Sequence, residues 1–135
     1  MTRIRKLLLR YINDATQPLT ANDIFVHSNS EADLATIYRA LHYFEQHGFV
    51  ESFSYHCEKE GTLRYYYPMR EEHTHFFHCA SCHMFIPLGP CMLHTLEEEL
   101  QAQYNVEISR HVLYFTGFCK ECAGKKNKNP CNHSS

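Results

Sequence analysis

Two cysteine pairs place the tightest constraint on the fold of this chain. Cys79-x-x-Cys82 and Cys119-x-x-Cys122 have the spacing that lets two thiolates reach one metal ion from a tight turn. Together the pairs can complete a tetrahedral four-sulfur shell, which leaves no open position for water. We therefore expect a structural zinc ion, and a fold that brings these two distant segments together.

The thiols also have other interpretations: two disulfides, a thioredoxin-like redox pair, or chance spacing. The chain has seven cysteines, an odd number for a secreted disulfide scaffold. A redox pair would need a CxxC that opens a helix in a βαβ context, whereas both pairs here flank predicted strands. Zinc is the interpretation that the pattern favours.

Charge and hydropathy restrict the partners. The net charge of −2 does not indicate a strongly basic nucleic-acid binder, so any DNA binding must use a local basic face. No apolar run approaches the roughly 18 residues of a membrane span, and no signal-peptide core follows the basic N-terminus. We expect a cytoplasmic protein with no membrane partner. The candidate basic residues are Arg3, Arg5, Lys6, Arg10 and Arg39.

The first half of the chain predicts three helices and a hairpin. Apolar spacing predicts a helix over 3–13, and Thr20 begins a capping box for a short helix that ends near His27. A third helix follows a cap at 30–33 and stops at Gly48. Its stripe is expected to point inward and consists of Leu34, Ile37, Leu41 and Phe44.

Residues 49–56 and 62–67 are rich in aromatic residues and valine and are separated by a turn, which predicts a β-hairpin. Three helices followed by a hairpin is the order of a winged helix-turn-helix. A helical hairpin packed on a β-ribbon, with no role in DNA binding, would produce the same pattern.

The second half predicts a small α/β domain. We expect a polar hinge at 69–75, a single strand over roughly 75–87 and a helix that opens at Gly89-Pro90 and runs to about residue 103. A long strand over 106–118 should follow, and residues 124–135 form a tail expected to be disordered.

Several histidines lie where they could form a second metal site. His73 and His75 project to the same side of an extended segment, His94 lies near a helix start, and His111 lies on a strand face with Leu113 and Phe115. The alternative is that these are ordinary core or solvated histidines, and spacing alone does not separate the two interpretations.

With these motifs, the sequence resembles the ferric uptake regulator family of bacterial metal-responsive repressors over about residues 3–122. The resemblance implies a homodimer whose winged-helix domains bind a palindromic operator in double-stranded DNA. It divides the chain into a DNA-binding domain (1–68), a hinge (69–75), a dimerisation domain (76–123) and a tail (124–135). The matching motifs are Leu34-Ala-Thr-Ile-Tyr-Arg-Ala-Leu41, Gly48-Phe-Val50, His73-Thr-His75, Cys79-x-x-Cys82 and the stretch from His111 to Cys119-x-x-Cys122.

The resemblance also assigns DNA contacts. By similarity, Tyr38 and Arg39 enter the major groove, where they can contact a thymine methyl and a guanine edge or phosphate. Backbone contacts would come from Thr36, Arg3, Arg5 and Lys6.

The family's regulatory metal site in the dimerisation domain falls, counted without gaps, on His73, His75, His94 and His111. Relatives usually have a carboxylate where this chain has His94. Four imidazoles suit zinc, iron(II), cobalt or nickel, and we expect zinc or iron(II). The family's hinge-bridging site looks absent, since its positions hold Pro18, Tyr67, Thr74 and Phe76. Nearby residues that could rebuild it are Glu51, Cys57, Glu71 and Glu72.

These observations predict a metal-dependent repressor of metal-homeostasis genes that senses zinc or iron, with no enzymatic activity and no small-molecule substrate. One alternative is a peroxide or redox sensor of the same family, which would use mixed carboxylate and histidine ligands. A more distant alternative is a zinc hydrolase. Hydrolysis would need an open water position and a carboxylate base, and the histidine pattern provides neither.

Overall fold

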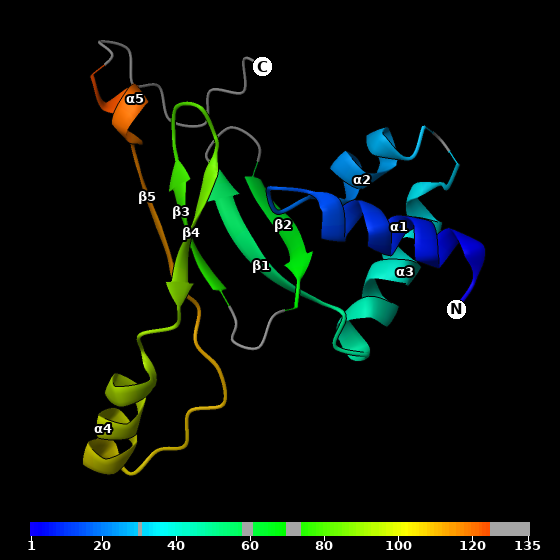
Figure 1. Ribbon diagram of the computed structural model, residues 1–135. Coiled ribbons are helices and arrows are strands. Elements are labelled where there is room, and N and C mark those ends of the chain that lie inside the picture. Colours follow the sequence, from blue (N-terminus) through cyan, green and yellow to red (C-terminus); the bar gives the residue numbers. More distant parts are fainter. Residues whose placement is uncertain (30, 58–60, 70–73, 125–135) are drawn as a thin grey trace. The chain divides into compact units, whose positions relative to one another are not determined.

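The computed structural model describes residues 1–29, 31–57, 61–69 and 74–124, and the chain divides into two compact units, Met1–Met69 and Arg70–Ser135 (Figure 1). The boundary lies beside the predicted end of the DNA-binding domain at residue 68. Most of the predicted hinge and nearly all of the predicted tail lie outside the described residues.

Three helices open the first unit: α1 (Arg3–Asp14), α2 (Ala21–His27) and α3 (Leu34–Gln46). Local hydrogen bonds set their starts. Thr20 and Asp23 form a reciprocal capping box on α2, and the Asp33 carboxylate accepts from the Thr36 N–H at 2.8 Å on α3. Gly48, at φ 73°, takes the left-handed conformation that ends α3 and turns the chain into the next strand.

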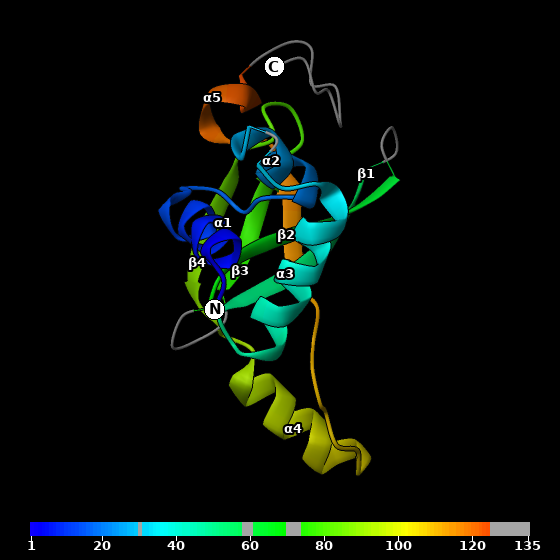
Figure 2. The same cartoon turned by 90° about the vertical axis from the view of Figure 1, so that its right-hand side faces the viewer.

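The hairpin of the first unit pairs β1 (Val50–Cys57) with β2 (Gly61–Pro68) antiparallel, from Val50 opposite Pro68 to Cys57 opposite Gly61 (Figure 2). The segment between α1 and α2 pairs with this hairpin. Leu19 and Tyr66 exchange two backbone hydrogen bonds, of 2.9 and 2.7 Å. The wing is therefore held against the helices through backbone as well as side chains, as the winged-helix prediction requires.

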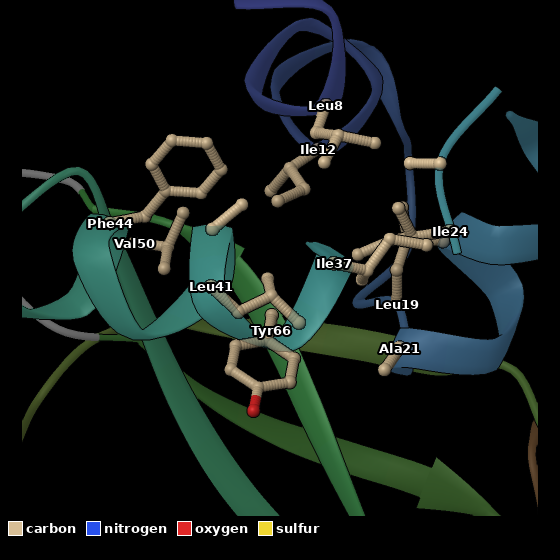
Figure 3. Packing of buried hydrophobic residues seen from close by; sticks show 12 residues of the cluster. Leu8, Ile12, Leu19, Ala21, Ile24, Ile37, Leu41, Phe44, Val50 and Tyr66 are labelled. Atoms are coloured by element: carbon tan, nitrogen blue, oxygen red, sulfur yellow. The ribbon is translucent and has the colours of Figure 1, made fainter. Parts of the chain in front are cut away.

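The core of the first unit lies between the three helices and the start of the wing (Figure 3). Leu34 is a correction to the predicted inward stripe: it is 40% exposed, because it is the first residue of α3 and precedes the turn that packs on the other helices. The large buried apolar side chains are Leu8, Ile12, Leu19, Ile24, Ile37, Leu41, Phe44, Val50 and Tyr66.

The second unit contains a three-stranded sheet of order β4-β3-β5, with β3 antiparallel to β4 and parallel to β5. Its helices are α4, after β4, and the short α5, after β5. The bounds are β3 (Thr74–Cys79), β4 (Phe85–Pro90), α4 (His94–Tyr104), β5 (Tyr114–Gly117) and α5 (Lys120–Ala123).

Four details of the second half differ from the predictions. The single strand over 75–87 is two strands, because the 80–84 turn reverses the chain, with His83 left-handed at φ 64°. The helix begins at His94 rather than at Gly89-Pro90, since both of those residues still belong to β4. The predicted strand over 106–118 is limited to Tyr114–Gly117, the residues that lie beside β3. Because β3 begins at Thr74, the last two residues of the predicted hinge belong to a strand.

The fold class is the predicted one: a winged helix-turn-helix unit followed by a small α/β unit that carries a four-cysteine cluster. Among the described residues, no helix has both the length and the apolarity needed to cross a bilayer.

Candidate metal centres and DNA-binding surface

The two predicted cysteine pairs meet in one cluster. Cys79 ends β3 and Cys82 lies in the turn that follows; Cys119 precedes α5 and Cys122 lies within it. All four sulfurs lie within 4.8 Å of one another. Three of these cysteines are buried, Cys82 is exposed, and Phe77 and Phe118 pack against the cluster.

The local backbone directs donors at the sulfurs. The N–H groups of Cys82 and Cys119 point to the Cys79 Sγ at 3.5 and 3.4 Å. Burial acts to raise the pKa of Cys79, but hydrogen bonds from the backbone N–H groups of Cys119, Cys82 and Ser81, together with the Cys82 thiol, outweigh it and lower that pKa to about 6. Desolvation and the adjacent thiols raise the pKa of Cys82 to about 12. Four thiolates at this spacing repel one another, so their full ionisation requires a cation.

The donor set fits zinc. The Cys82 and Cys119 sulfurs are 3.9 Å apart. Tetrahedral coordination with Zn–S bonds of about 2.3 Å separates two sulfurs by about 3.8 Å. Four soft donors in tetrahedral reach, with backbone N–H groups directed at one of them, are the features of a closed structural zinc site.

A second cluster of metal-binding groups forms at the other end of β3. It consists of His75, Cys91 and His111, whose donor atoms also lie within 4.8 Å of one another. The His75 Nε2 lies 2.9 Å from the His111 Nε2 and 3.3 Å from the Cys91 Sγ, and that sulfur lies 3.4 Å from the His111 Nε2. His75 is buried, and the other two are half-buried.

The outward nitrogens of both imidazoles are held by acceptors. The His75 Nδ1 lies 3.0 Å from the Leu113 carbonyl oxygen, which can only accept, so His75 carries its proton on Nδ1. The His111 Nδ1 lies 3.0 Å from a Glu97 carboxylate oxygen, with both side chains largely covered. A carboxylate or carbonyl behind the imidazole is the usual arrangement in metal-ligating histidines.

The predicted four-histidine site is only partly brought together. The structure joins His75 and His111, whereas His73 lies outside the described residues. His94 is not in this cluster: its side chain is 83% exposed, and its Nε2 lies 2.9 Å from a Glu98 oxygen one turn along α4. This placement follows from the late start of α4, which makes His94 the first residue of the helix rather than one within it.

Cys91 and Glu97 are the residues that reasoning from the sequence missed. Cys91 lies in the short connection between β4 and α4, and Glu97 lies one turn into α4. The signal in the sequence was that Cys91 directly follows Gly89-Pro90 and is close in sequence to histidines, which bind the same metals as a thiolate does.

Two of the residues that could rebuild a hinge-bridging metal site, Glu51 and Cys57, lie on β1 of the first unit. The Tyr67 hydroxyl donates a hydrogen bond to the Glu51 carboxylate at 2.8 Å, so these two side chains pair with each other. Cys57 lies at the end of β1. Glu71 and Glu72 lie outside the described residues.

The predicted DNA-contacting residues lie on α1 and α3. Tyr38 is 56% exposed on α3, and the Arg39 guanidinium next to it donates to the Thr36 hydroxyl at 3.2 Å. Arg5 on α1 stacks over the Tyr43 ring of α3, 4.2 Å from its centroid, which links the two helices at a positively charged position. Arg3 and Lys6 are exposed on α1.

Comparisons with known proteins agree with this architecture. The model of the family described as "Ferric uptake regulator family" matches residues 1–116. The ferric uptake regulation protein of Vibrio anguillarum is 28% identical over 116 residues, which cover 84% of this chain and 75% of that protein.

Two solved structures show the same fold. A Helicobacter pylori ferric uptake regulator with three functional metal-binding sites has 20% identity and a TM-score of 0.72, covering 94% of this chain and 84% of that one. A zinc uptake regulator complexed with zinc and DNA has 20% identity and a TM-score of 0.66, covering 90% of this chain and 82% of that one.

Proposed function

Because the chain belongs to the ferric uptake regulator family, whose members are transcriptional regulators rather than enzymes, we propose that it is a repressor of metal-homeostasis genes. In this role a divalent metal at the His75 and His111 cluster controls operator binding. Family membership makes the chain a DNA-binding metalloregulator. We propose which metal it senses and which genes it regulates.

The observation that carries the proposal is the pair of facing imidazoles, whose Nε2 atoms are 2.9 Å apart. Because the Leu113 carbonyl and the Glu97 carboxylate face the Nδ1 atoms, both Nε2 atoms are left directed at the space where one metal ion could bind. A metal ion bound by these imidazoles would connect β3, which carries His75, to the segment before β5, which carries His111. Glu97, which faces His111, would add α4 to the same connection.

The sensor acts through its position in the chain. His75 is the last residue of the predicted hinge and the second residue of β3, and the family pattern assigns His73 in the hinge to the same site. Fixing these ligands would favour one conformation of the connection between the two units. We infer that the metal selects the DNA-binding state in this way.

The four-cysteine cluster has a different role in this proposal. It holds a structural zinc that joins the end of β3 to the segment around α5. Its donors are contributed by residues 40 apart in the sequence, counted from Cys79 to Cys119, so the metal closes a long loop in a small unit. The zinc would stabilise this unit without taking part in sensing.

The proposed assembly is a homodimer on a palindromic operator. In the second unit, α4 buries none of its residues, and β5 forms an edge of the sheet. Large apolar side chains are exposed along this part of the chain, as expected for a face covered by a second copy. They are Met92, Leu96, Tyr104, Val106, Val112 and Phe115. A two-fold dimer would present two α3 helices to symmetric half-sites.

Operator binding measured after chelation and re-addition of single metals tests the proposal. Wild-type protein that keeps its structural zinc should bind the operator tightly only when the second metal is restored. The variant His75→Ala with His111→Ala should stay folded and lose this response. Retained metal-dependent binding in the double variant would reject the assignment of these histidines as the sensor.

A further inference from the structure

Resting on the sensor site proposed above, we infer that Cys91 is a thiolate ligand of that site. The regulatory metal would then be held by two imidazole nitrogens and one sulfur, in place of the four histidines that the family pattern suggests. This donor set favours zinc or cobalt(II) over iron(II).

The distances support one ion shared by three donors. Zn–N bonds of about 2.05 Å and a Zn–S bond of about 2.3 Å give tetrahedral separations of about 3.3 Å between nitrogens and about 3.5 Å between nitrogen and sulfur. The observed separations are 2.9 Å between nitrogens, and 3.3 and 3.4 Å from nitrogen to sulfur. Each differs from the ideal by a few tenths of an ångström, so small side-chain rotations suffice.

The orientations of the imidazoles support the same conclusion. The Leu113 carbonyl and the Glu97 carboxylate each face an Nδ1 atom, which directs both Nε2 lone pairs inward. The Cys91 sulfur is within hydrogen-bonding distance of both Nε2 atoms. One cation placed between these three donor atoms would be within bonding reach of all of them.

The backbone explains how Cys91 reaches the site. β4 continues to Pro90, which pairs with Thr74 at the start of β3. Cys91 therefore leaves the sheet beside His75, before the chain turns into α4. Had the helix begun at Gly89-Pro90, as the sequence predicted, Cys91 would lie in its first turn.

Ligand softness sets the metal preference. Thiolates favour zinc and other borderline or soft ions, whereas carboxylate and water ligands favour manganese, magnesium and calcium. The Glu97 carboxylate contacts the His111 Nδ1 atom and is not one of the clustered donors. Among the described residues, the donors that face the metal position are therefore nitrogen and sulfur. Replacing one imidazole with a thiolate should therefore raise zinc affinity more than iron(II) affinity.

Cobalt(II) provides a readout other than DNA binding. Protein with zinc already in the four-cysteine cluster is titrated with one further equivalent of cobalt(II), and thiolate-to-cobalt charge transfer is followed in the near-ultraviolet. Wild type should show this band as the metal binds. Cys91→Ser should still bind cobalt but lack the band, while Cys57→Ser, the matched control in the first unit, should retain it.

Competition between metals tests the preference. Cys91→Ser should lose about 10- to 100-fold in zinc affinity and clearly less in iron(II) affinity, and Cys91→Asp should shift the preference further toward iron(II). Thermal melting of each variant verifies folding, so a lost band can be assigned to the ligand.

Two results would overturn the inference: a full charge-transfer band in Cys91→Ser, or a wild-type second site that binds cobalt with no thiolate band. Either would leave the regulator assignment intact if operator binding still follows metal. The proposed function itself fails in a different way, when metal fills the site with the thiolate band present but operator binding does not change.

Discussion

The two metal-binding clusters of the second unit lie at opposite ends of β3 and differ in the number and the type of their donor atoms. The cluster around Cys79 has four identical soft donors, three of them buried, on segments linked by backbone hydrogen bonds. The cluster around His75 mixes nitrogen and sulfur, and two of its three members are half-buried. One strand thus carries a closed, uniform site at its end and a more open, mixed site at its start.

This contrast separates a structural role from a sensing role. Closed thiolate shells bind zinc tightly enough to become part of folding. A sensing site must instead load and empty as the metal concentration changes, which requires access and weaker binding. Substitutions in each cluster can therefore show whether the two roles are separable in one small unit.

The largest effect is expected from Cys119→Ser. Structural zinc contributes roughly 10–16 kcal/mol of apparent binding free energy in small domains, so losing one ligand should unfold the second unit. Thermal unfolding and sedimentation should show the loss of this unit and of the dimer, with the helices of the first unit retained. Cys57→Ser is the matched control and should behave as wild type. A folded, dimeric Cys119→Ser protein would contradict the structural role.

The double variant His75→Ala with His111→Ala should keep its fold and lose only the second metal. We expect the zinc of the four-cysteine cluster to remain and the fold to survive, because the second cluster is partly exposed. Affinity for the second metal should fall by at least about 100-fold, since disturbing ligand partners alone costs 10- to 100-fold. Calorimetry measures the affinity for the second metal, and metal analysis measures the zinc that remains in the four-cysteine cluster. If the double variant also lost the structural zinc, the two clusters would not be independent.

Glu97→Gln should produce a smaller change in the sensing cluster alone. The amide cannot act as a charged acceptor for the His111 Nδ1 proton, so the affinity for the second metal should fall by about 10-fold. Glu98→Gln is the control, because Glu98 contacts the exposed His94 instead. Equal losses in both variants would indicate a general charge effect rather than support of His111.

Arg39→Ala should have the smallest effect and should not involve either cluster. Loss of a phosphate or base contact on α3 is expected to cost about 1–2 kcal/mol in operator affinity. Metal affinity and stoichiometry should stay at wild-type values. Fluorescence anisotropy with an operator duplex measures the loss. A changed metal affinity would mean that the two units are coupled even without DNA.

Predictability differs between the two units as well. The first was predicted nearly to its helix boundaries, because capping residues such as Thr20 and Asp33 and the stop at Gly48 act within a few residues. In the second unit, the strand and helix bounds depend on which segments pair with β3. That pairing joins residues far apart in the sequence, so local patterns placed the start of α4 too early and predicted a single strand across the 80–84 turn.

The sequence by itself determined the four-cysteine cluster and the family, since a CxxC pair places two sulfurs correctly wherever its turn forms. It also indicated His75 and His111. Only the tertiary structure separated His94 from the site and brought in Cys91 and Glu97. Counting positions assumes that the chain follows the same path between β4 and α4 as in relatives. In this chain α4 starts at His94, and this start decides which side chain points at the two histidines.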